Sequence, residues 1–165
     1  MKTLENLAKF CAILAGVLLT FITLMTCVSI VGRETIGKTI SGDFELSGVA
    51  AGAAIALFMP WCQFKRGNIF VDFFTAKASI NTQKAMERFG AFLVAAVMAL
   101  VAWRTVLGGL NAYSANSGTM LLGFPEYVVY AAMVPPLALT ALIALHQGIF
   151  GFAGKATAAN PEFAV

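Results

Sequence analysis

Four long stretches free of acidic and basic side chains, interrupted only by Arg104, dominate the hydropathy pattern of this chain. They cover residues 10–31, 46–64, 89–110 and 127–153. A helix of about 20 apolar residues crosses a membrane core of about 30 Å, because each residue adds about 1.5 Å. The pattern therefore predicts an all-α membrane protein, a bundle of four transmembrane helices that forms a single domain over residues 1–165.

Lysine and arginine are divided unequally between the two sides of the predicted membrane. The side that holds both chain ends and the loop at 65–88 carries eight of them, and the other side carries three, Arg104 included. Basic residues are enriched on the cytoplasmic side, so both termini are predicted to be cytoplasmic. The first stretch is too long for the core of a signal peptide, and no small-residue cleavage pattern follows it. We therefore expect an uncleaved first helix.

The composition excludes several classes of protein. Hydrophobic residues make up 59% of the chain and charged residues only 12%, against about 25% charged residues in soluble domains. A soluble domain and a disordered chain are both excluded on this ground. The net charge of +3 comes without a basic stripe, which argues against a nucleic-acid partner. The three scattered cysteines favour neither a disulfide framework nor a metal site.

Polar residues at the ends of the stretches predict how the helices begin. Asp43 stands where an N-cap is expected, and Glu45 falls in the first turn of the second helix, where a carboxylate favours the helix dipole. Pro125 opens the fourth helix, as is typical of proline at the first helical position. Between the second and third helices, residues 79–88 alternate apolar and charged positions and predict a short amphipathic helix at the inner membrane surface.

The stretches offer little chemistry at membrane depth, where a carrier or an enzyme needs polar groups. Arg104 is expected near the outer end of its helix, where its side chain either snorkels to the interface or forms a salt bridge with a partner. His146 is the only histidine, so the paired axial ligands of a haem are missing. We predict no catalytic, cofactor or metal site, and hence a protein that is not an enzyme.

Small residues at helical spacing predict close packing of helices. On the second helix the stripe consists of Gly48, Gly52 and Ala56. On the third helix it consists of Ala91, Ala95 and Ala99. Pro135 in the fourth helix predicts a kink or local unwinding, which is tolerated where protein surrounds it. These features are typical of a packing scaffold.

Four local patterns occur together in this order. Arg33 follows the first stretch, Phe44-Glu45-Leu46 opens the second, and Lys65-Arg66-Gly67-Asn68-Ile69-Phe70-Val71-Asp72 ends it. Gly123-Phe124-Pro125-Glu126-Tyr127-Val128-Val129-Tyr130, followed by Pro135, opens the fourth. Over residues 28–136 the chain resembles the small permease subunit of tripartite ATP-independent periplasmic (TRAP) transporters.

The resemblance implies a scaffold-like subunit in the bacterial inner membrane. Its partners would be a separate large permease subunit, a periplasmic binding protein and membrane lipids. The complex would take up an organic acid, driven by a sodium gradient. The alternatives from the residues alone are a self-sufficient small transporter or channel that works as a homo-oligomer, and a membrane enzyme or redox protein.

The charged residues of these motifs have two interpretations each. Lys65 and Arg66 either anchor the second helix among anionic headgroups or contact the large subunit, and Asp72 is a partner for one of them. Arg33 and Glu45 flank the same outer loop. They either form an ion pair that closes it or provide a docking contact for the binding protein.

Overall fold

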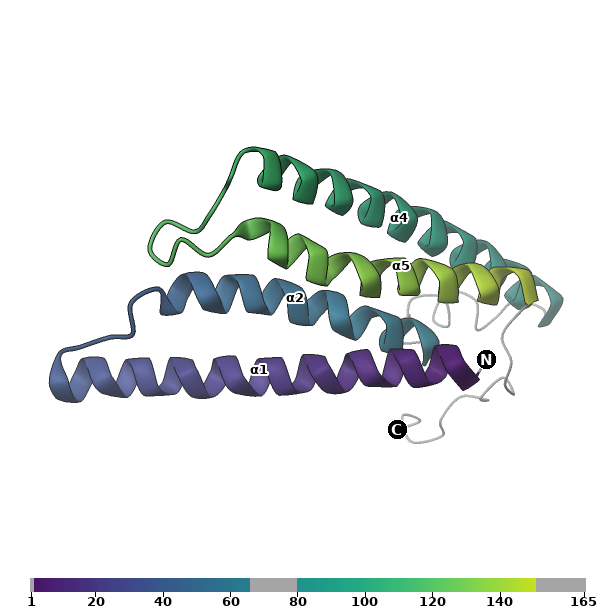
Figure 1. The fold of residues 1–165 in the computed structure, drawn as a ribbon. Helices are drawn as coiled ribbons and strands as arrows, with labels where there is room; N and C mark the ends of the chain where they lie inside the picture. Colours follow the sequence, from purple (N-terminus) through teal and green to yellow (C-terminus); the bar gives the residue numbers. More distant parts are fainter. Residues whose placement is uncertain (1, 66–79, 151–165) are drawn as a thin grey trace, which may run out of the picture.

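Four long helices account for most of the structure, a computed structural model that describes residues 2–65 and 80–150 (Figure 1). They are α1 (Lys2–Ile36), α2 (Asp43–Phe64), α4 (Ile80–Ser114) and α5 (Glu126–Phe150). Each is long and apolar enough to cross a membrane. The predicted all-α membrane fold with four transmembrane helices is therefore confirmed.

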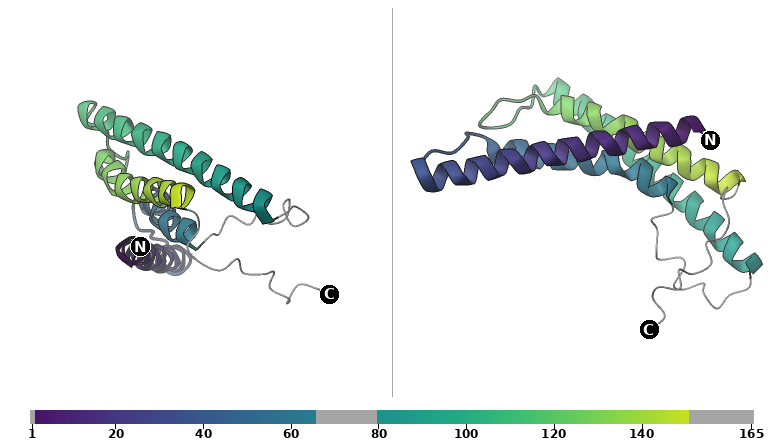
Figure 2. Two further views of the ribbon diagram at one scale, coloured as in Figure 1. Left: turned by 90° about the vertical axis from the view of Figure 1, so that its right-hand side faces the viewer. Right: turned by 90° about the horizontal axis from the view of Figure 1, so that it is seen from below.

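The helices form a row, in the order α4, α5, α2, α1, in place of the expected bundle. In the described part of the chain α4 packs only against α5, α5 also packs against α2, and α2 packs against α1. Figure 2 shows the same succession from the end of the helices and from below. Apart from a small contact between α1 and α5, only neighbours in the row pack together, so α4 and α1 each have an edge that no other described helix covers.

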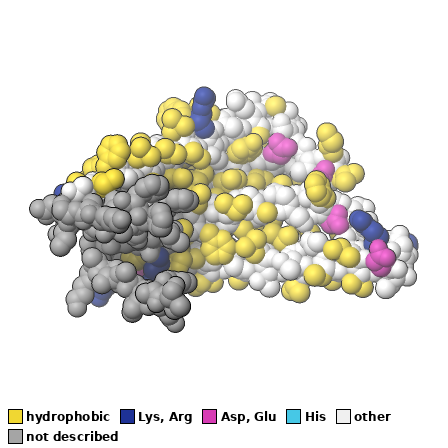
Figure 3. All heavy atoms as spheres, turned by 180° about the vertical axis from the view of Figure 1, so that it is seen from behind, with side chains coloured by type: hydrophobic (Ala, Val, Ile, Leu, Met, Phe, Trp, Pro, Cys, Tyr) yellow, Lys and Arg dark blue, Asp and Glu magenta, His cyan; other side chains and the backbone are white. Residues whose placement is uncertain are grey.

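A row buries much less surface than a bundle. Between 11% and 28% of the residues in the most apolar part of each helix are buried. Figure 3 shows hydrophobic side chains across much of the rear face. In a chain that crosses a membrane, these open faces meet lipid or other protein.

Small residues set the close approach of α4 and α5. On α4, Ala91, Ala95, Ala102 and Ala112 are buried. Gly109 lies so close to α5 that an added Cβ would stand 3.0 Å from the Cβ of Tyr130. Such small side chains let two helix backbones approach, which is how membrane helices gain van der Waals contact.

Two helices extend well beyond the apolar stretches that predicted them. Helix α1 begins at Lys2 and ends at Ile36. From Ile80 onward, the segment predicted as a separate interfacial helix is continuous with α4, whereas residue 79 lies outside the described residues. Helix α4 also continues ten residues past Arg104, to Ser114, so Arg104 is farther from the end of its helix than its sequence pattern suggested.

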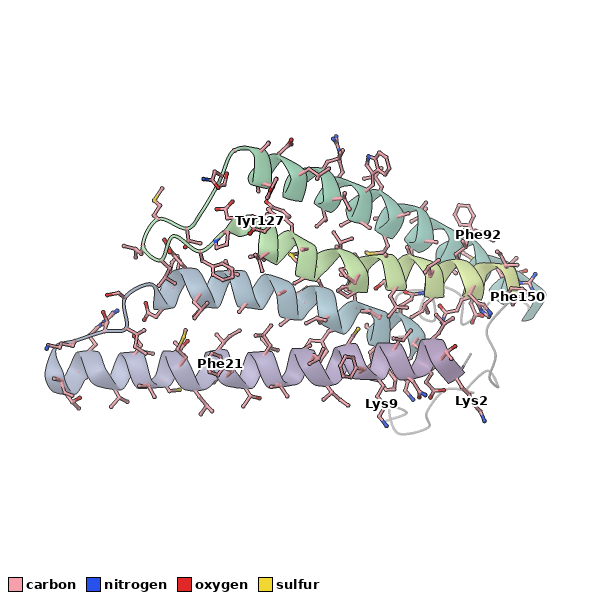
Figure 4. The ribbon with its side chains drawn as sticks, viewed as in Figure 1. Lys2, Lys9, Phe21, Phe92, Tyr127 and Phe150 are labelled. Atoms are coloured by element: carbon pink, nitrogen blue, oxygen red, sulfur yellow. The ribbon has the colours of Figure 1, made fainter. Side chains whose placement is uncertain are left out.

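Both described ends of the chain lie at the same end of the row. Lys2 and Phe150 are found there, far from Tyr127 at the start of α5 (Figure 4). Following the predicted orientation, we call the end with Lys2 and Phe150 the inner end and the opposite end the outer end.

Candidate functional site

The carboxylate of Glu45 joins the start of α2 to the loop between α4 and α5. It accepts hydrogen bonds from the backbone N–H of Leu121 at 3.0 and 3.2 Å and from that of Leu122 at 3.3 Å. Glu45 lies in the first turn of α2, whereas both donors belong to the loop between α4 and α5. We call Glu45 and residues 119–124 the outer clasp, because this contact ties the α4–α5 half of the row to α2.

The loop of the outer clasp is ordered by its own hydrogen bonds. The N–H of Thr119 donates to the carbonyl of Phe124 at 3.0 Å, and the N–H of Gly123 donates to the carbonyl of Thr119 at 2.9 Å. The Thr119 hydroxyl also accepts the N–H of Phe124 at 3.1 Å. Gly123 has a φ of 62°, a left-handed conformation that favours glycine. The loop thereby holds Met120 outward, 99% exposed.

The shorter outer loop, between α1 and α2, is held in the same region. The buried hydroxyl of Ser29 on α1 donates a hydrogen bond to the Asp43 carboxylate and accepts the N–H of Ile40 at 3.4 Å. Gly42, with a φ of 80°, packs directly against the side chain of Leu122. Gly42 is also the N-cap of α2, so Asp43 is the first helical residue and not the cap that the sequence suggested.

A buried amide pair joins α2 and α5 near the inner end. The side-chain N–H of Gln63 donates to the side-chain oxygen of Gln147 at 2.8 Å, and the side-chain N–H of Gln147 donates to the backbone carbonyl of Gln63 at 3.2 Å. Both side chains are buried, 6% and 7% exposed. No role was predicted for this pair from the sequence. The available signal was the position of two amide side chains inside otherwise apolar stretches.

The predicted charged sites fall at different places in the row. Arg33 is exposed in the last turn of α1, and in the described part of the chain no ion pair joins it to Glu45. Lys65 follows α2, where its N–H bonds to the carbonyl of Trp61 at 2.9 Å and its ammonium lies 5.0 Å from the centroid of the Trp61 ring system. Arg66 and Asp72 lie outside the described residues.

The residues predicted to pack helices also differ in their surroundings. Ala56 is 3% exposed and belongs to one buried apolar cluster with Ala102 of α4 and Leu137 of α5. In contrast, a Cβ added at Gly48 or at Gly52 would meet no atom within 4 Å. Within the described chain, the Gly48–Gly52 part of the stripe is therefore open.

An open apolar groove runs between the outer parts of α4 and α5. Its volume is about 510 Å³, and it is lined by Gly109 and Tyr113 of α4 and by Tyr127, Tyr130 and Pro135 of α5, among others. The rings of Tyr113 and Tyr127 meet edge to face, with their centroids 5.4 Å apart. Aromatic rings of this kind are enriched where membrane proteins meet the interface.

The polar side chains described here connect helices and loops, and they do not converge on a reactive centre. Among residues 2–65 and 80–150 no three His, Cys, Asp or Glu side chains are grouped so as to hold a metal ion. The ring of His146 packs against that of Phe150, with the ring centroids 4.7 Å apart. The fold thus defines a helical membrane protein with four helices that can span the membrane.

The family of the chain follows from a comparison with family models. Residues 22–153 match the DctQ component of tripartite ATP-independent periplasmic transporters. The chain belongs to this family: it is the small subunit of a TRAP transporter in the inner membrane, and it is not an enzyme. Searches of curated proteins and of solved structures gave no match.

Proposed function

We propose that this chain is a scaffold that binds a separate large permease subunit in a sodium-driven transporter. The large subunit carries the substrate and sodium sites, and a periplasmic binding protein delivers an organic acid to the complex. The family supports the general role, because a TRAP small subunit works with these two partners.

The row of helices, with its open edges and faces, is the observation that carries this proposal. Along α1, large apolar side chains at Val17, Phe21, Leu24 and Val28 are each 62–63% exposed. Either lipid or protein can cover such side chains. However, a single layer of four helices encloses no interior in which a substrate could cross, so a second membrane protein has to provide the transport path.

The few polar side chains inside the helices also support the proposal that the transport path lies in another subunit. Gln63 and Gln147 bond to each other, and Thr140 bonds to the carbonyl of Pro136 at 2.8 Å. Ser29 is engaged with Asp43. In the described part of the chain, buried polar side-chain atoms all have partners. A carrier site needs polar groups that are free to exchange those partners for substrate or ion.

The charged residues at the helix ends are assigned to anchoring and docking in this proposal. Lys65 and Arg66 hold the inner end of α2 at anionic headgroups, with Asp72 as their counter-charge. At the outer end, the outer clasp keeps the loops in one arrangement, and Arg33 is exposed beside them for the binding protein. Glu45 contributes by fixing this surface and is itself engaged with the backbone.

Co-expression with the large permease subunit of the same transporter tests the proposal. With the affinity tag on the large subunit, we expect the two chains to purify in mild detergent as a one-to-one complex. A tagged membrane protein of another family, expressed in the same way, provides the control. The proposal is wrong if the two chains purify apart and if deletion of this chain leaves uptake unchanged.

A further inference from the structure

Arg104 points away from every other helix of this chain. The side of α4 that faces α5 carries the buried residues Ala95 and Ala102. Successive residues of a helix are turned by about 100°, so Arg104 is turned about 200° from Ala102. Since α4 packs only against α5 in the described structure, the Arg104 side of α4 forms the uncovered edge of the row (Figure 1).

Arg104 also lies within the apolar part of α4. Ten residues separate it from Ser114, the end of α4, which corresponds to about 15 Å along the helix. Toward the inner end, sixteen residues separate it from Arg88, or about 24 Å. In Figure 1 the outer end of α4 is set back from the outer end of α2, and the loop after α4 runs outward before it turns back to α5. Six residues, or about 9 Å, separate Arg104 from Leu110, the last residue of the apolar stretch, so Arg104 lies inside the apolar part of α4.

The neighbours of Arg104 on this edge are apolar and exposed. Before it stand Val97, 47% exposed, and Leu100, 63% exposed, and after it stands Leu107, 38% exposed. In the described part of the chain Arg104 is exposed and has no hydrogen bond or ion pair. Charged side chains at this depth are costly against lipid and nearly always pair within protein. A counter-charge for Arg104 is therefore missing from the described part of the chain.

We infer that the edge of α4 formed by Val97, Leu100, Arg104 and Leu107 binds a helix of the large permease subunit that presents a carboxylate to Arg104. This inference rests on the proposed function. It names the surface of this chain that meets the large subunit and the chemical group that the partner offers.

The distribution of charge favours a helix of the large subunit over two other occupants, a lipid phosphate and a second copy of this chain. A lipid phosphate lies at the interface, beyond Leu110 and so more than about 9 Å along α4 from Arg104. A second copy of this chain, related by a two-fold axis along the membrane normal, would bring a second arginine to the same depth. All eight acidic residues lie outside the four apolar stretches, so a copy has no carboxylate to offer at that depth.

Replacement of Arg104 in the co-expressed pair tests the charge. We expect Arg104→Leu to lower the amount of this chain recovered with the tagged large subunit by about tenfold or more, because the partner carboxylate is then buried without a counter-charge. Arg104→Lys retains most of the binding. The matched control is Lys38→Leu, which removes an exposed cation from the loop between α1 and α2 and leaves recovery unchanged.

A cross-linking experiment tests the surface independently of the charge. A single cysteine at Leu100, in an otherwise cysteine-free chain and alkylated with a photoactivatable maleimide cross-linker, is expected to form a cross-linked product with the large subunit when membranes are irradiated. A product with a second copy of this chain, or no product at all, overturns the inference. So does wild-type recovery of the Arg104→Leu variant.

The two proposals fail in different ways. If the wild-type chain binds the large subunit and Arg104→Leu binds equally well, only the surface is wrong. If the wild-type chain does not bind the large subunit, the proposed function is wrong as well. The helix content of the isolated variants, measured by circular dichroism in detergent, separates loss of binding from loss of folding.

Discussion

A double-mutant cycle on Gln63 and Gln147 measures how strongly α2 and α5 are joined at the inner end. Gln147→Leu removes both hydrogen bonds of the pair, at 2.8 and 3.2 Å. Hydrogen bonds between membrane helices contribute about 0.6 kcal/mol on average and about 1.7 kcal/mol at most. Gln63 is buried and loses a hydrogen-bond acceptor, which adds to the loss, so we expect Gln147→Leu to lower the free energy of unfolding by about 1–3 kcal/mol.

The coupling energy isolates the side-chain bond from everything else that each residue does. Gln63 takes part in a further interaction of its own, so a single substitution there is harder to interpret. In the double variant both side-chain amides are replaced by apolar groups, so neither leaves the other without its partner. We therefore expect a coupling energy of about 0.6 kcal/mol, and no more than about 1.7 kcal/mol.

The assay is unfolding of the purified chain in mixed micelles by added SDS, followed by circular dichroism. The control is Asn111→Leu, because Asn111 is an exposed amide near the end of α4. It should change the free energy of unfolding by less than about 0.5 kcal/mol. A coupling energy of zero, or a Gln147→Leu variant as stable as the wild-type chain, would show that the pair does not hold these helices together.

Three further predictions concern the clasp, the packing and the orientation. Glu45→Gln weakens the charge-assisted hydrogen bond from the Leu122 N–H, so hydrogen exchange at that amide becomes faster. Exchange as slow as in the wild-type chain refutes the role assigned to Glu45. Gly109→Ala overpacks the α4–α5 contact and lowers the free energy of unfolding by about 1–3 kcal/mol, whereas Gly52→Ala places its methyl group in open space and does not lower it. Equal effects of the two substitutions would contradict the packing described. A cysteine introduced at Ser41 is labelled by an impermeant reagent from the periplasmic side, and labelling from the cytoplasm alone would reverse the predicted orientation.

The positions of the four helices could be predicted from the sequence because membrane helices are specified locally. Each stretch needs only enough apolar residues to span the core, and that information lies within about 20 consecutive positions. The ends of α1 and α4 were harder to predict. Both helices continue into polar residues, such as Lys2 and Arg88, that hydropathy assigns to loops.

The arrangement of the helices and their polar contacts could not be predicted because they depend on residues far apart in the chain. Glu45 bonds to Leu121, 76 positions away, and Gln63 bonds to Gln147, 84 positions away. The position of a small residue in the sequence also does not indicate which helix packs against it. The stripe on α4 is buried against α5 at Ala95, yet Gly48 on α2 is open within this chain. Only the structure separates a contact inside the subunit from a surface left for another protein.

Reconstitution into lipid vesicles tests the central claim, that this chain supports a transporter without being the carrier. Three preparations are compared: this chain alone, the large permease subunit alone, and the two together, each with the binding protein loaded with an organic acid and with an inward sodium gradient. We expect sodium-dependent uptake from the pair only. Uptake by this chain alone, or full uptake by the large subunit alone, would contradict the account.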